Sequence, residues 1–173
     1  LAAVQAAPIV IFTDSEGQQY PVVPAAHRPL SDLPPDFWVQ VVVGFFAWII
    51  SASVWVFRRE DVAARYLLLS GFATLMFAPG AAVYSTRELA VPLTELLLLK
   101  TMNFGGGLLY CGTMIALLWH YPRRLGPTWV SLAVVGGFLL WFVIQALGAV
   151  DSMLVGRRWP VFIALTTTLV LAV

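Results

Sequence analysis

Residues 37–57 read FWVQVVVGFFAWIISASVWVF and contain no charged side chain. The hydrocarbon core of a bilayer is about 30 Å thick, and a helix needs about 20 mostly apolar residues to cross it. This stretch is long enough and apolar enough to cross it, and it ends at the charged sequence Arg58-Arg59-Glu60-Asp61. It therefore predicts a membrane-spanning helix.

Further apolar stretches follow along the chain, separated by charged or proline-containing segments. They predict spans at 66–84, 96–119, 129–150 and 160–173. Because the last stretch is shorter than a span requires, we expect it to be part of a longer helix. The pattern is that of an all-α polytopic membrane protein.

The composition of the whole chain supports this class. Of its 173 residues, 60% are hydrophobic and 11% are charged, and the mean hydropathy is +0.86. Soluble domains carry roughly 25% charged residues, and a chain of this size could not hide so much apolar surface from water. The net charge of +1 gives no basis for binding nucleic acid. The single cysteine, Cys111, excludes an intramolecular disulfide and a cysteine-based zinc site.

The N-terminal part has a different character. Two β-prone runs at 9–12 and 19–23 flank the turn-forming sequence TDSEG at 13–17, which predicts a small β-hairpin. The following segment, 24–35, is rich in proline and predicts a linker. Residues 1–7 are compatible with the end of a signal peptide or of an earlier membrane helix.

We therefore expect two parts. Residues 1–36 form an extracytoplasmic β-hairpin and proline-rich linker, and residues 37–173 form a transmembrane helical bundle. With the hairpin outside, arginines in the inner loops outnumber those in the outer segments only narrowly, which agrees weakly with the positive-inside rule. The inner set is Arg58, Arg59, Arg65, Arg123 and Arg124, and the outer set is Arg28, Arg87, Arg157 and Arg158.

The third span carries a group of polar side chains at membrane depth. Glu95 stands at its entrance, Lys100 lies further in, and Asn103 follows on the same helix face as Lys100. An ionisable side chain within a membrane marks a candidate functional site. A lysine near the end of a span can instead extend its ammonium to the lipid headgroups. Both interpretations of Lys100 stand at this point.

Glycines within the spans predict close helix packing. Gly105-Gly106-Gly107 removes side chains from almost a full turn, which favours the close approach of a neighbouring helix over a hinge. Gly136-Gly137 in the fourth span predicts a packing notch of the same kind.

Pro79-Gly80 predicts a kink in the second span, because proline removes a helix hydrogen bond. Such a kink either opens a ligand cavity or only bends the helix. His120, at the end of the third span, is interpreted as an interfacial anchor together with Trp119 and Tyr121. No phosphate-binding loop, metal-ligand cluster or catalytic pair is visible, so we expect no cofactor and no metal, and we assign no catalytic residue.

The chain from about residue 9 to residue 173 resembles the multi-helix membrane input modules of bacterial sensor histidine kinases, and two segments carry the resemblance. One is the hairpin IVIFTDSEGQQYPVV at 9–23, which leads through its linker into a helix that ends in charges. The other is GGGLLYCGTMIALLWHYPRRLG at 105–126, where residues 118–124 are similar to the aromatic–proline–basic end of cytoplasmic span termini in that family. The family includes quorum-sensing and competence kinases and seven-helix signalling receptors. Its phospho-accepting histidine, ATP-binding domain and coiled-coil linker are not in these residues, so no catalytic residue carries over.

The resemblance implies a signal-sensing domain in the bacterial inner membrane that transmits ligand binding to a cytoplasmic histidine kinase. A small molecule, a peptide or a lipid-phase molecule is the implied ligand, and a homodimer would form through a cytoplasmic part outside this sequence. The expected ligand site combines polar anchors, a charged mouth and aromatic walls. Its residues are Glu95, Lys100, Asn103, Arg87, Glu88, Tyr84, Tyr110 and Trp141.

Two other functions stay open. A transporter or channel subunit would need broken helices, which Pro79-Gly80 and the triple glycine offer, but it would also show an internal repeat, and none is evident. A structural subunit of a larger membrane complex fits the many aromatic residues and small-residue notches equally well. An intramembrane enzyme is the least supported class.

Overall fold

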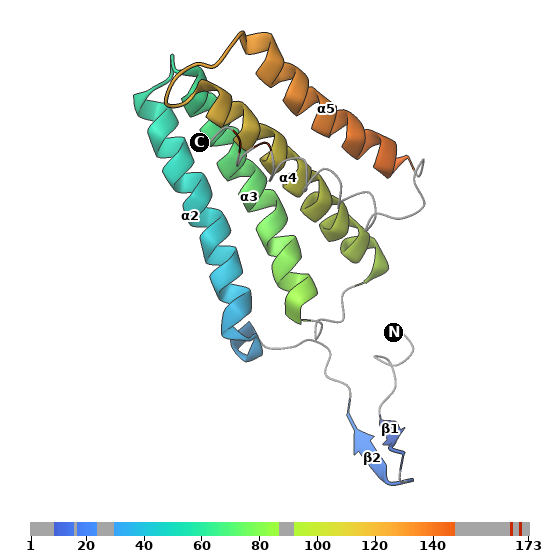
Figure 1. Cartoon of the computed structure of the whole chain (residues 1–173). Helices are drawn as coiled ribbons and strands as arrows, with labels where there is room; N and C mark the ends of the chain where they lie inside the picture. Colours follow the sequence, from blue (N-terminus) through green and yellow to red (C-terminus); the bar gives the residue numbers. More distant parts are fainter. Residues whose placement is uncertain are drawn as a thin grey trace.

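The computed structural model describes residues 9–15, 17–23, 30–86 and 92–147, together with Thr167 and Val170. Two short strands and a 3-10 turn precede four α-helices in this part of the chain (Figure 1). Their bounds are β1 Val10–Thr13, β2 Gln19–Val22, η1 Leu30–Asp32, α2 Pro35–Phe57, α3 Val62–Thr86, α4 Leu93–His120 and α5 Thr128–Ala146. The predicted span at 160–173 lies outside the described residues, apart from Thr167 and Val170, whose backbone is helical.

The predicted β-hairpin is confirmed. Its strands pair antiparallel, with Val10 opposite Val22 and Phe12 opposite Tyr20. Gly17 closes the turn at a φ of 82°, a conformation that glycine adopts without the steric cost of a side chain. Because alternate residues of a strand point to the same face, these two pairs give the hairpin one apolar face.

The four predicted helices are present, and each is long and apolar enough to cross a membrane. Their ends agree with the predicted ones to within four residues: α3 begins at Val62 instead of 66, and α5 ends at Ala146 instead of 150. The shortest, α5, has 19 residues and is about 29 Å long at a rise of about 1.5 Å per residue. This is close to the thickness of the hydrocarbon core.

The helix starts follow from local chemistry. Pro35 is the first residue of α2, while Pro92 and Pro127 stand directly before α4 and α5. Proline suits these positions because the first N–H groups of a helix have no acceptor within it. At the start of α3, the Asp61 carboxylate instead accepts a hydrogen bond of 2.9 Å from the Ala63 N–H.

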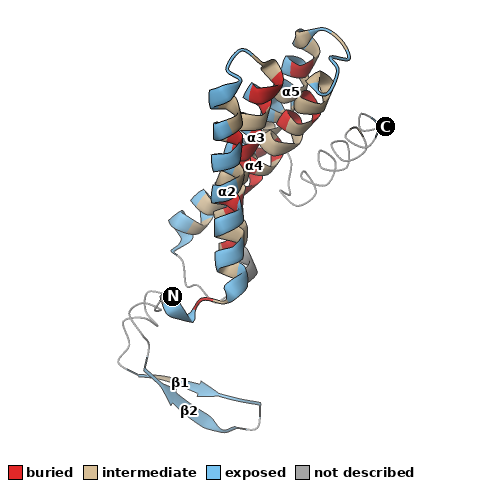
Figure 2. Cartoon of the chain, turned by 90° about the vertical axis from the view of Figure 1, so that its left-hand side faces the viewer, coloured by how far each residue is buried: buried red, intermediate tan, exposed pale blue. Residues whose placement is uncertain are grey.

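The helices lie side by side in chain order, α2 against α3, α3 against α4, and α4 against α5 (Figure 1). The buried residues gather where α3 and α4 meet, whereas α2 is largely exposed (Figure 2). The two outer helices carry many exposed large apolar side chains, among them Phe45, Phe46, Ile49 and Ile50 on α2 and Trp129, Leu132 and Leu140 on α5. The exposed faces of these two helices are therefore apolar.

Small residues allow the helices to approach closely. A Cβ atom on Gly44 of α2 would lie 2.9 Å from the Cβ of Ala78 on α3. A Cβ atom on Gly106 of α4 would lie 2.9 Å from the main-chain oxygen of Ala73 on α3. Gly105 faces the other way, since a Cβ there would lie 3.1 Å from the Phe142 ring of α5. Two members of the triple glycine thus serve different helix interfaces.

No described element packs into the notch predicted at Gly136 and Gly137. A Cβ atom on either residue would meet no atom of the described residues within 4 Å. Among these residues, packing therefore places no demand on the size of either glycine.

Candidate functional site

Asn103 is the predicted site residue that lies deepest in the protein. Its side chain is 7% exposed, and its Nδ2 donates a hydrogen bond of 2.9 Å to the main-chain oxygen of Phe77 on α3. Gly80 makes room for it, because a Cβ atom there would lie 2.9 Å from the Asn103 Cβ. α3 continues through Pro79, which lacks a helix N–H. Asn103 therefore ties α4 to the proline-containing turn of α3.

The other two polar residues of the predicted site on α4 do not join Asn103. Lys100 and Glu95 are both exposed, although Lys100 precedes Asn103 by less than one helical turn. This placement fits the interpretation in which the lysine extends to the lipid headgroups. The three side chains form no common polar group in the described structure.

The predicted mouth of the site falls mostly outside the described residues. Arg87 and Glu88 lie there, and Tyr84 belongs to α3 while its side chain is not described. These residues stay predictions.

The two predicted aromatic walls occupy different interfaces. The Tyr110 ring meets the Phe77 ring edge to face, with centroids 5.8 Å apart, and so belongs to the α3–α4 contact. Trp141 instead lines a pocket at α5. The sequence alone predicted one aromatic-walled site, whereas the structure separates its members.

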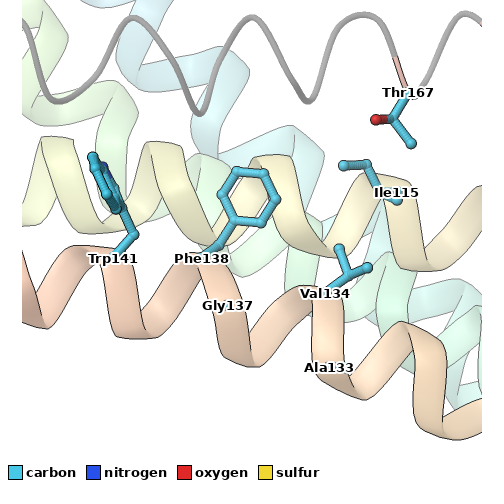
Figure 3. Close-up of a pocket in the computed structure, with 7 residues that line it drawn as sticks. All are labelled: Ile115, Ala133, Val134, Gly137, Phe138, Trp141 and Thr167. Carbon is cyan, nitrogen blue, oxygen red and sulfur yellow. The ribbon is translucent and has the colours of Figure 1, made fainter.

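The pocket at Trp141 has a volume of about 300 Å³ and lies between α4 and α5. In Figure 3, the side chains of Val134, Phe138 and Trp141 rise from α5 toward Ile115 of α4 and toward Thr167. The described residues that line it are Ile115, Ala133, Val134, Gly137, Phe138, Trp141 and Thr167. None of these residues is charged, so this part of the lining suits an apolar occupant.

Because Gly137 has no side chain, it leaves one side of this pocket open. It is among the lining residues, and a Cβ atom on it would meet no other atom within 4 Å. Gly136, its neighbour in the chain, has equally open surroundings but does not line the pocket. Space for an occupant is thus available where a side chain at 137 would stand.

A polar cluster that sequence reasoning missed joins three helices. The hydroxyl of Ser131 on α5 lies 2.9 Å from the Tyr66 hydroxyl of α3 and 3.0 Å from Nε2 of His120 on α4. The rings of Tyr66 and His120 are stacked, with centroids 5.6 Å apart. Tyr66 and Ser131 are 65 residues apart in the chain, so no local pattern could have paired them.

The bonding of this cluster points to a structural role. Ser131 is 1% exposed, and its hydroxyl donates a hydrogen bond of 2.8 Å to the main-chain oxygen of Thr128. Its oxygen is then left to accept from Tyr66 and His120, which uses the full capacity of a hydroxyl group. A serine held in this way has neither a free proton to give to His120 nor access to a substrate.

The loop between α4 and α5 is held by its own contacts. Arg124 donates from Nε to the main-chain oxygen of Gly126 at 2.8 Å and from Nη2 to Oγ1 of Thr128 at 2.7 Å. The Leu125 N–H donates to the main-chain oxygen of Trp119 at 3.0 Å. His120, predicted as an interfacial anchor, therefore lies between the polar cluster and a loop that is held by hydrogen bonds. In the described ranges, no group of three His, Cys, Asp or Glu residues could hold a metal ion.

Comparison of the chain with protein-family models, with curated proteins and with solved structures finds no match. The candidate site therefore rests on the geometry of the α4–α5 pocket and of the contacts around it.

Proposed function

We propose that this chain is an integral membrane protein whose helices α2 to α5 cross the bilayer. Two observations support this: each helix has the length and composition of a span, and the outer helices α2 and α5 expose large apolar side chains. In water such continuous apolar faces favour aggregation, whereas lipid tails match them without cost.

The proposed orientation places the hairpin outside the cell. α2 ends and α3 begins at the same end of the helical layer as the α4–α5 loop, and the hairpin lies beyond the opposite end (Figure 1). Five arginines gather at that loop end, namely Arg58, Arg59, Arg65, Arg123 and Arg124. Because arginine-rich loops stay in the cytoplasm, this end faces inward. The resemblance to bacterial sensor kinases supports the inner membrane as the location.

The function that we propose is the sensing of an apolar, lipid-phase molecule at the α4–α5 pocket. A cytoplasmic histidine kinase as its output follows from the resemblance to sensor kinases. The carrying observation is the pocket itself, whose apolar lining comes mainly from α5, with Ile115 from α4. A ligand there contacts α4 and α5 together. It therefore favours whichever relative placement of the two helices gives it the better contacts.

The polar cluster would be the fixed point when the relative placement of α4 and α5 changes. Tyr66, His120 and Ser131 fasten α5 to α3 and α4 at the loop end. Of the other described helices, only α4 packs extensively against the rest of α5. A change at the pocket would thus swing the far end of α5 while its start stays in place. The signal passed on is a change in helix geometry.

Photolabelling in lipid nanodiscs tests ligand binding. The probe is an uncharged decyl diazirine, a hydrocarbon chain that forms a covalent adduct on illumination. We expect adducts on pocket residues and about tenfold less labelling in Gly137→Leu, as a side chain there occupies the pocket. Gly136→Leu is the matched control, because its side chain enters equally open space outside the pocket. Equal labelling of the two variants would disprove the site.

Spin labels test the movement. In a Cys111→Ser background, Leu98→Cys on α4 and Leu140→Cys on α5 place labels at exposed positions away from the polar cluster. We expect the distance distribution to change when the decyl probe is added and to stay the same in Gly137→Leu. If the distance distribution stays the same when the probe is added to the protein that keeps Gly137, sensing through α5 is disproved.

A further inference from the structure

Gln145 is a buried polar residue whose side chain has no hydrogen-bond partner among the described residues. Its side chain is 3% exposed, and neither Nε2 nor Oε1 has a hydrogen-bond partner in the described part of the chain. Most side chains around it on α5 are exposed or half-buried. The amide is therefore shielded from solvent and unpaired at once.

Gln145 continues the row of α5 side chains that line the pocket. Val134, Phe138 and Trp141 are lining residues, and Gln145 follows Trp141 by four positions. The spacing of four, three and four residues keeps all of them on one helix face. The amide thus stands one turn beyond the tryptophan wall, on the side that faces the pocket.

An unpaired amide in this setting is costly. An amide buried without a hydrogen bond loses its bonds to water and gains none in return. Within a bilayer no water is at hand to lower that cost. The position therefore favours any occupant of the pocket that brings a hydrogen-bonding group to the amide.

We propose that the α4–α5 pocket takes a small neutral amphiphile whose apolar body fills the pocket and whose polar group hydrogen-bonds to Gln145. This inference rests on the proposed function and names the class of ligand. A primary amide or an alcohol fits, because the glutamine side chain offers both a donor and an acceptor. A charged head fits less well, since none of the described lining residues carries a charge. The volume of about 300 Å³ restricts the ligand to the small end of the range for small-molecule sites.

Two probes of equal length separate the polar contact from the apolar one. The first is the decyl diazirine hydrocarbon, and the second is the matching diazirine of decanamide, which carries a terminal amide. We expect the wild-type protein to be labelled more strongly by the amide probe. In Gln145→Leu, labelling by the amide probe should fall about three- to tenfold, the loss of one neutral hydrogen bond, while labelling by the hydrocarbon stays the same.

The folded state of the variants is checked by thermal unfolding. Gln145→Leu breaks no hydrogen bond of the described structure, so its melting temperature should equal or exceed that of the wild type. Gln145→Met is a second apolar replacement and should give the same labelling pattern. The inference is overturned if the amide probe labels both variants as strongly as the wild type.

The outcomes separate a failure of this inference from a failure of the proposed function. If Gly137→Leu blocks both probes while the Gln145 variants change neither, the pocket stands and the role of Gln145 is disproved. If Gly137→Leu blocks neither probe, the proposed ligand site itself fails.

Discussion

Asn103 of α4 reaches across to α3, where its side-chain Nδ2 donates a hydrogen bond of 2.9 Å to the main-chain oxygen of Phe77. The bond joins the helix that carries the triple glycine to the turn that contains Pro79. A polar side chain that faces lipid has no such partner, so the bond explains why an asparagine is tolerated at this depth.

Replacing Asn103 should weaken the α3–α4 contact. We expect Asn103→Leu to lower the free energy of unfolding by about 1 kcal/mol, the usual size of a hydrogen bond between membrane helices. Unfolding by SDS in mixed micelles measures this. Thr101→Val is the control, since Thr101 bonds only within α4 through the main-chain oxygen of Leu97, and it should change stability less. Equal losses would mean that the bond to Phe77 contributes nothing.

Gly106 should tolerate no side chain. A Cβ atom there would lie 2.9 Å from main-chain atoms of Ala73 and Phe77, which cannot move aside without separating the helices. We expect Gly106→Ala to cost about 1–3 kcal/mol of stability. Gly136→Ala, in open space, should instead be neutral or stabilise the helix by up to about 1 kcal/mol. The same micelle titration compares the two, and a neutral Gly106→Ala would refute the close packing.

Removing the Ser131 hydroxyl should loosen the corner where three helices meet. Ser131→Ala leaves the Tyr66 hydroxyl and the His120 ring without their shared partner, and we expect a loss of about 1–3 kcal/mol. Ser53→Ala is the matched control, because Ser53 is exposed and bonds only to its own helix. A Ser131→Ala protein as stable as this control would show that the cluster does not fasten α5.

Cysteine labelling tests membrane insertion and orientation together. In the Cys111→Ser background, a membrane-impermeant maleimide added to intact bacterial cells should label Thr13→Cys on the hairpin. It should label Leu125→Cys in the α4–α5 loop only after the membrane is opened. The opposite result would reverse the orientation, and labelling of both in intact cells would contradict a four-span insertion.

Lys100 should matter little for folding. Its side chain is exposed, so we expect Lys100→Gln to change the free energy of unfolding by less than about 0.5 kcal/mol. Labelling by the decyl probe should also stay unchanged, because Lys100 does not line the pocket. A loss of labelling in this variant would restore the lysine to the ligand site that its sequence position suggested.

The residues predicted as a site show where sequence reasoning stops. Lys100 and Asn103 were grouped because their spacing places them on one helix side, yet only Asn103 is buried. The direction of a helix face is defined only relative to the helices packed against it, and the pattern of α4 alone does not show which of its faces meets α3 or α5. Gly136 and Gly137 show the same limit: their pattern predicted a notch, and the packing leaves them in open space.

The amino-acid sequence by itself determined the local elements, namely four apolar helices and a hairpin around Gly17. Length, hydropathy, prolines and turn residues act over a few neighbouring positions, so they can be read along the chain. Tertiary structure alone decided which side chains meet: Asn103 with Phe77, Tyr66 with Ser131, and Trp141 with the walls of a pocket. These contacts depend on how closely and in what rotation the helices pack, and small residues on α2, α3 and α4 set that packing.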